Sequence, residues 1–126
     1  QSMKFIGPPR FIPSPAVDRK QGSFAMVYSV QQIKYEILAY MKEFGGDFSE
    51  YYVGVSDDPE NALFKSHQVD RGKDPWLYKQ ALTYQAARTA QDYFLSRLKS
   101  DGEAIAGGNE DWDCVYVYKK SQRTAP

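Results

Sequence analysis

The stretch that most limits how this chain can fold is residues 51–67, YYVGVSDDPENALFKSH. Its first part is rich in β-branched and aromatic residues, which predicts a strand over 51–55. Gly54 inside that strand predicts either a bulge or a close approach of other atoms to the backbone. Asp58 followed by Pro59 favours a helix start, because an Asp side chain caps free backbone N–H groups and proline fits the first helical turn. The stretch therefore predicts a strand, a tight turn and a capped helix.

Regular elements are also predicted on both sides of this stretch. Ser29 and Gln32 form a capping-box pattern before apolar residues spaced three and four apart, which predicts a helix that ends at Gly45-Gly46. The other predicted elements are a short strand over 24–28, a strand over 76–81, a helix from the N-cap Thr83 through Leu98, and a strand over 114–119. Together they predict an α+β (mixed α/β) domain in which helices pack on a small sheet of about three to four strands.

The length of 126 residues predicts one domain. Gln1-Ser2-Met3 resembles the remnant of a cleavable tag, so a natural leader could have been removed. Residues 1–22 are expected to be this remnant and a proline-rich extended arm, residues 23–120 the domain, and residues 121–126 a polar tail. The apolar segment 5–12 of the arm is expected to lie on the domain, on a second copy in a homodimer, or on a protein partner.

The charge and composition of the chain limit which partners and which cellular location can be expected. Sixteen basic and sixteen acidic residues cancel, which excludes binding to nucleic acid through bulk electrostatics alone. Basic residues do exceed acidic ones within 71–99, so either a local basic face or a solvated surface of mixed charge is expected there. No apolar run approaches the roughly 20 residues that span a bilayer, so no membrane contact is predicted. The single Cys114 excludes an internal disulfide and favours a reducing, cytoplasmic location.

Few residues support a metal or nucleophile site. His67 is the only histidine, so a His-rich zinc site or a choice of catalytic triads cannot be drawn. Asp57 and Asp70 could join His67 around a divalent ion, but the nearby Asp58 is already assigned to a helix cap. The loop around Gly107-Gly108 is acidic and lacks a lysine, so it would repel a phosphate. No metal site is predicted.

Tyr52-Val53-Gly54, followed by a turn and a helix that ends in His67, resembles the second half of the GIY-YIG nuclease signature. The resemblance extends over residues 51–119. In that family a tyrosine lies near the attacking water, an arginine stabilises charge on the phosphate, and a glutamate on a later helix holds one divalent metal ion. The resemblance implies a GIY-YIG-like scaffold, with a groove formed by Tyr52, His67, Gln91, Tyr116 and Tyr118.

The chain departs from this family at its charged positions. Ala62 stands where the arginine is expected, and Gln91 stands where the glutamate is expected. An amide is a poorer magnesium ligand than a carboxylate, and Asp92 would point about 100° away around the helix. The first half of the signature is also missing before Tyr51. A circular permutation would repair this, with the strand 114–119 lying beside the strand 51–55.

These observations predict a catalytically inactive GIY-YIG-like domain that retains a nucleic-acid contact through candidates such as Lys65 and Arg88. The alternative is a small interaction or assembly module that uses segment 5–12. The third hypothesis is an active metal-dependent endonuclease. No cofactor is expected unless this third hypothesis holds, in which case the chain would need a divalent metal such as Mg²⁺.

Overall fold

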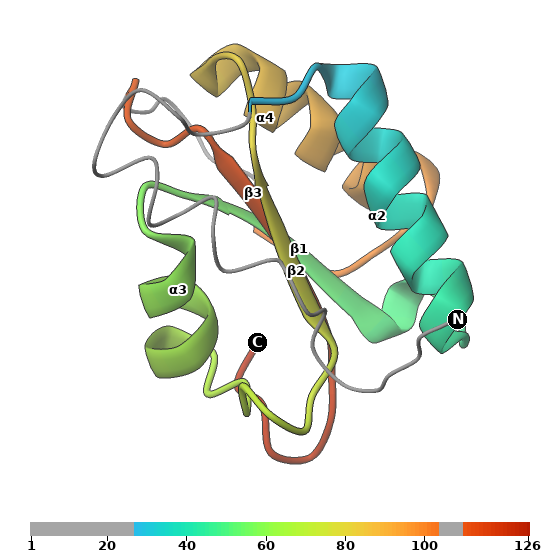
Figure 1. Ribbon diagram of the computed structural model, residues 1–126. Coiled ribbons are helices and arrows are strands. Elements are labelled where there is room, and N and C mark those ends of the chain that lie inside the picture. Colours follow the sequence, from blue (N-terminus) through green and yellow to red (C-terminus); the bar gives the residue numbers. More distant parts are fainter. Residues whose placement is uncertain (1–26, 104–109) are drawn as a thin grey trace.

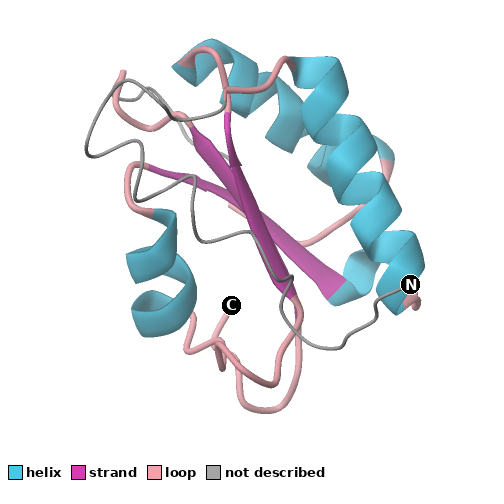
Figure 2. Cartoon of the chain, in the orientation of Figure 1, coloured by secondary structure: helices cyan, strands magenta, loops and turns pink. Residues whose placement is uncertain are grey.

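A computed structural model of the protein describes residues 27–103 and 110–126. Its sheet has three antiparallel strands in the order β1-β3-β2. The strands are β1 (Tyr51–Ser56), β2 (Trp76–Gln80) and β3 (Cys114–Lys119), and the α-helices are α2 (Val30–Phe44), α3 (Pro59–Asn61) and α4 (Tyr84–Asp92). Helices α2 and α4 cover one face of the sheet and α3 covers the other (Figures 1 and 2). The predicted α+β fold is confirmed.

Local capping signals set where the helices begin. The Ser29 side chain accepts from the backbone N–H of Gln32, and the Gln32 side chain accepts from the backbone N–H of Ser29, so the predicted capping box is formed. Asp58 and Thr83 cap α3 and α4 in the predicted way. Both of these helices continue into single π-helical segments, Ala62–Ser66 and Tyr93–Arg97, which the sequence did not indicate.

Strand β3 lies between the other two strands, and its register with β1 pairs Tyr52 with Tyr118 and Gly54 with Tyr116. The predicted neighbourhood of strands 51–55 and 114–119 is therefore confirmed. The pairing runs through all six residues of β1 without interruption, so the bulge that Gly54 allowed is not formed.

The strands bury both faces of the sheet, and the two faces differ in composition. The side that meets α2 and α4 is here called the aliphatic face, and its residues are Val53, Val55, Leu77, Val115 and Val117. The side that meets α3 is called the aromatic face, and its residues are Tyr52, Trp76, Tyr78, Tyr116 and Tyr118. All ten side chains are at least nine-tenths buried.

The C-terminal residues 121–126 pack on the domain. Thr124 is buried, and the backbone N–H of Ala125 donates to the carbonyl of His67 over 2.7 Å. The predicted arm 5–12 and the Gly107-Gly108 loop lie outside the described residues, as does most of the predicted strand 24–28. Of that strand the structure describes Val27 and Tyr28, and Tyr28 forms an isolated bridge with Ala81. Within the described part of the chain, no helix is long and apolar enough to cross a membrane.

Candidate functional site

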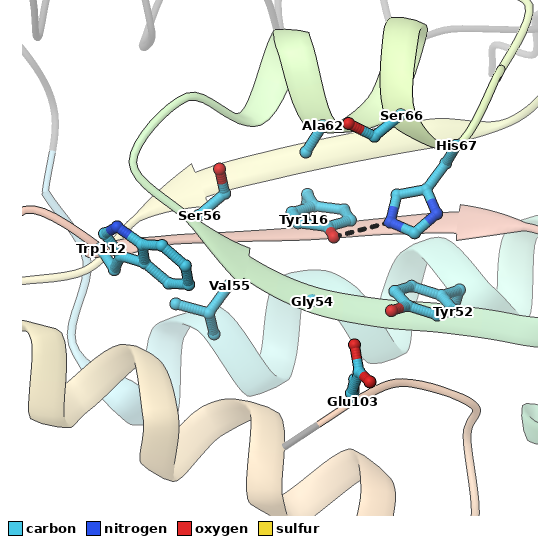
Figure 3. A pocket seen from close by; sticks show the side chains of 10 residues that line it. All are labelled: Tyr52, Gly54, Val55, Ser56, Ala62, Ser66, His67, Glu103, Trp112 and Tyr116. Atoms are coloured by element: carbon cyan, nitrogen blue, oxygen red, sulfur yellow. Dashed lines mark hydrogen bonds between the residues drawn. The ribbon is translucent and has the colours of Figure 1, made fainter. Parts of the chain in front are cut away.

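A hollow runs along the outer edge of β1, between the helical segment of α3 on one side and the chain near Glu103 on the other (Figure 3). Its volume is about 240 Å³. Its lining residues are Tyr52, Gly54, Val55, Ser56, Ala62, Ser66, His67, Glu103, Trp112 and Tyr116. A second hollow of about 340 Å³ shares Tyr52, His67 and Glu103 with the first and extends to Asp101 and Pro126.

Gly54 allows the ring of Tyr116 to lie across β1. A Cβ atom built on Gly54 would lie 2.3 Å from Cζ of Tyr116, a separation that no real pair of carbon atoms could keep. The absence of a side chain at Gly54 thus brings the Tyr116 hydroxyl to the edge of the sheet. This close approach is the second of the two predictions made for Gly54, and it is confirmed.

His67 is held by hydrogen bonds at both ring nitrogens. Nδ1 lies 2.8 Å from the carbonyl oxygen of Ala125, which can only accept, so Nδ1 carries a proton. With the proton on Nδ1, Nε2 is left as the acceptor for the Tyr116 hydroxyl, which lies 2.9 Å away (Figure 3). The hydroxyl of Tyr118 lies 3.2 Å from Nδ1. This arrangement fixes both the tautomer and the orientation of the imidazole.

Tyr52 stacks beside two other tyrosines. Its ring centre lies 5.4 Å from that of Tyr118 and 6.2 Å from that of Tyr116, with nearly parallel planes. Burial is the largest cause that raises the pKa of Tyr116 and of Tyr118 far above the ordinary value. Burial also raises the pKa of Tyr52, with smaller contributions from the carboxylates of Glu103 and Asp101. These hydroxyls therefore stay protonated at neutral pH and do not act as bases, and the Tyr116 hydroxyl donates to Nε2 of His67.

The rim of the two hollows is acidic. Asp101 accepts from Lys120 Nζ over 3.1 Å and is thereby neutralised as a pair. Glu103 is exposed, and its carboxylate lies below the strand near Tyr52 in the view of Figure 3. Among the described residues that line either hollow, none is a lysine or an arginine. The net charge contributed by the lining is therefore negative.

Four of the five predicted groove residues meet here. Tyr52, Tyr116 and Tyr118 surround His67, with ring centres 4.5 to 5.6 Å from the imidazole. Gln91 reaches the neighbouring backbone from α4. Its side-chain amide donates to the carbonyls of Val53 and Glu103 over 3.2 and 3.0 Å, so it fastens α4 to β1 and to the rim.

The two predicted nucleic-acid contacts lie elsewhere. Lys65 is exposed on the segment that continues α3 and does not line either hollow. Arg88 lies on α4 with its guanidinium 5.6 Å from the ring centre of Tyr84, and it lines a separate surface hollow with Gln85, Thr89 and Asp92. Neither Lys65 nor Arg88 therefore lines the hollows that contain Tyr52 and Tyr116.

Among the aromatic and charged residues that line the first hollow, Glu103 and Trp112 were absent from the sequence-based groove. Both belong to the acidic glycine-rich loop, where no periodic pattern indicates which side chains face a site. A tryptophan in an otherwise polar loop was the one available signal, because such a residue generally needs a surface to pack on. Trp112 does pack against the core and lines the hollow beside Val55 (Figure 3).

The chemistry of this site cannot be assigned from a metal-binding group or from similarity to a known protein. Within residues 27–103 and 110–126, no group of three His, Cys, Asp or Glu side chains is placed to hold a metal ion. Comparisons of the chain with protein-family models, with curated proteins and with solved structures found no match. The resemblance to GIY-YIG nucleases stays a prediction from the sequence.

Proposed function

We propose that this protein is a GIY-YIG-like domain that does not cleave nucleic acid. The observation that carries the proposal is the place of Ala62, which lines the same hollow as Tyr52 and His67. A phosphodiester transition state gathers negative charge and needs a cation there. At the position where the family resemblance implies an arginine, this hollow has a methyl group.

Gln91 supports the same proposal. A metal ligand must direct an oxygen at the ion, whereas the Gln91 amide nitrogen donates to two backbone carbonyls and the side chain is 3% exposed. The side chain thus has a structural role between α4 and β1. A glutamate there would place a carboxylate against the same two carbonyl oxygens.

A nuclease assay tests this proposal directly. Supercoiled plasmid is incubated with the protein in Mg²⁺ or Mn²⁺, and nicking is followed on a gel. The expected result is no cleavage above the buffer blank. Metal-dependent nicking that persists through purification, that disappears in Tyr52→Phe and that remains in the exposed-surface control Tyr35→Phe would overturn the proposal.

Introducing the glutamate that the family resemblance implies at position 91 tests the structural role of Gln91. In Gln91→Glu a carboxylate oxygen would replace the donor to the two backbone carbonyls, and the expected loss is about 1 to 3 kcal/mol in the free energy of unfolding. Gln85→Glu, on an exposed position of the same helix, serves as the matched control and should change stability little. Equal stability of the two variants would show that the amide of Gln91 has no structural role.

A nucleic-acid contact remains part of the proposal, and it would lie outside the tyrosine hollow, at Lys65 and Arg88. Duplex binding that weakens steeply with salt, and that weakens further in Lys65→Ala and Arg88→Ala, would support it. Binding that is absent at low salt would remove this part of the proposal and would leave the domain without activity or nucleic-acid contact. The alternative function through segment 5–12 concerns residues outside the described part of the chain.

A further inference from the structure

We propose that the hollow at the edge of β1 binds the head group of an organic cation of the alkylammonium class. Three aromatic side chains line it, Tyr52, Trp112 and Tyr116, and one carboxylate, Glu103, lies on its rim (Figure 3). Aromatic faces attract cations through their quadrupole, and quaternary ammonium groups are ligands that aromatic side chains recognise in this way. A carboxylate on the rim adds a full negative charge to that attraction. This inference does not depend on the resemblance to nucleases.

The neighbouring charges favour a cation over an anion. Lys120 is the nearby described cation, and it is paired with Asp101. Glu103 has no such side-chain partner among the described residues, and its charge contributes to the raised pKa of Tyr52. A phosphate or carboxylate ligand would meet this negative charge with no lysine or arginine in the described lining to offset it.

The chemistry of the lining also separates an organic cation from a metal ion. Magnesium and calcium require several oxygen ligands, about six or more, whereas Glu103 is the one carboxylate that lines this hollow among the described residues. A weakly hydrated ammonium head group can instead exchange water for ring faces. The volume of about 240 Å³ lies below the roughly 300 Å³ at which drug-sized pockets begin, so the hollow fits a head group and not a large ligand.

Hydrogen bonds below the hollow hold the Tyr116 part of its aromatic wall in place. Tyr116 is held by His67 and lies across Gly54, while His67 is held by Ala125. A wall that is already fixed loses little conformational entropy when a ligand binds, which favours recognition of a small head group.

The test is an NMR titration of the full chain with choline and with 3,3-dimethyl-1-butanol, its uncharged isostere. The expected result is saturable shifts for choline at residues 52–56 and 112–116, with at least 10-fold weaker binding of the isostere. Equal binding of the two compounds would show an apolar hollow without charge recognition, and the absence of saturable shifts for choline would overturn the proposal. Competition by inorganic phosphate at equal ionic strength would also overturn it.

Matched variants assign the binding to these side chains. Glu103→Gln should weaken choline binding about 5- to 10-fold, whereas Glu43→Gln, an exposed change on α2 across the sheet, should leave it unchanged. Trp112→Leu should abolish most of the binding, and Trp112→Phe should retain part of it. Because Trp112 packs on the core, thermal unfolding of each variant is measured first, and Glu103→Gln keeps the proposal falsifiable if Trp112→Leu does not fold.

Two sources of an alkylammonium group can be separated in the same titration. A trimethyllysine amide presents the head group on a peptide-like stem, while choline presents it as a free small molecule. Tighter binding of the trimethyllysine amide would indicate a protein partner, and tighter binding of choline a metabolite. A positive nuclease assay would overturn the proposed function without affecting this result, so the two failures are distinguishable.

Discussion

On the side of the sheet that meets α2 and α4, the strands present Val53, Leu77 and Val117; on the side that meets α3, they present Tyr52 and Trp76 with their neighbouring tyrosines. Both sets are buried to a similar degree. The aliphatic face is closed by the apolar stripes of two helices, and the one tyrosine hydroxyl that the strands place on that side, of Tyr51, donates to backbone carbonyls at the end of α2. The aromatic face carries the hydroxyl groups of four tyrosines, and each buried hydroxyl needs a partner.

This need for partners explains why the candidate site lies on the aromatic face. The Tyr78 hydroxyl donates to Glu60 over 2.8 Å, and the Tyr116 hydroxyl donates to His67. Each partner comes from α3 or from the residues that follow it. Burial contributes stability on both faces, but the aromatic face also fixes the direction of polar groups at the edge of β1. The comparison thus separates a face closed mainly by aliphatic packing from a face on which hydrogen bonds orient polar side chains.

The largest expected effect tests the aliphatic side. Phe94 is fully buried in the π-helical segment that follows α4, so Phe94→Ala should lower the free energy of unfolding by about 3 to 5 kcal/mol, measured by urea denaturation. Leu82→Ala, at a position that is 61% exposed, is the control and should have little effect. A loss below about 1 kcal/mol for Phe94→Ala would mean that this side is not the main source of stability.

Alkaline pH tests the buried tyrosine at the aliphatic side. Burial, followed by the charge of Glu50, raises the pKa of Tyr51 to about 12. The unfolded chain ionises from about pH 10, so stability should be full below that pH and should fall as pH rises towards 12, by about 1.4 kcal/mol per pH unit for this residue. Urea denaturation at pH 9, 10 and 11 measures the slope.

Tyr51→Phe is the control for this titration and should give a shallower slope. Its absolute stability at pH 8 will also fall, because the Tyr51 hydroxyl lies 2.7 Å from the Gly45 carbonyl and donates to it. Only the change with pH therefore reports the titration. An identical slope in the wild type and the variant would assign the alkaline loss to the tyrosines of the aromatic face.

Gly54→Ala tests the aromatic face through its backbone. The new methyl group would overlap the Tyr116 ring, so the ring must move away from His67 at an expected cost of about 1 to 3 kcal/mol. Gly72→Ala is the matched control, because its methyl group would lie 3.7 Å from its nearest neighbour, the Asp70 side chain. Similar unfolding midpoints for the two variants would show that Tyr116 has room to move.

Tyr116→Phe should have the smallest effect, about 1 kcal/mol, because it removes one hydrogen bond and keeps the ring. The nitrogen chemical shifts of His67 provide the sharper measurement, since Nε2 loses its donor. Tyr35→Phe, at a position that is 71% exposed, should change neither stability nor these shifts. Unchanged His67 shifts in Tyr116→Phe would contradict the hydrogen bond that orients the imidazole.

The sequence predicted best what depends on near neighbours in the chain. Helix starts at Ser29, Asp58 and Thr83 follow from side chains that bind the backbone three residues on, and all three are confirmed. The neighbourhood of β1 and β3 was also predicted, although they are far apart in sequence. That prediction depended on a family resemblance, because strand composition alone does not specify which strands pair.

Contacts between distant segments account for what was not predicted. The carbonyl that fixes His67 belongs to Ala125, 58 residues away, and one of the carbonyls that bind Gln91 belongs to Val53, 38 residues away. No periodicity or capping motif encodes such contacts. For the same reason the sequence could place Gln91 near a groove but could not show that its amide serves the backbone.

The short segment around Asp101 has a further consequence for the behaviour of the chain at high concentration. Its backbone N–H donates to Tyr51 and its carbonyl accepts from Val53, both over 2.9 Å, so it covers part of the open side of β1. Uncovered strand edges template pairing between molecules and lead to aggregation. By occupying these backbone groups, Asp101 disfavours strand pairing between molecules. Its position depends on Gly102, because a Cβ atom added there would lie 2.4 Å from the carbonyl oxygen of Val53.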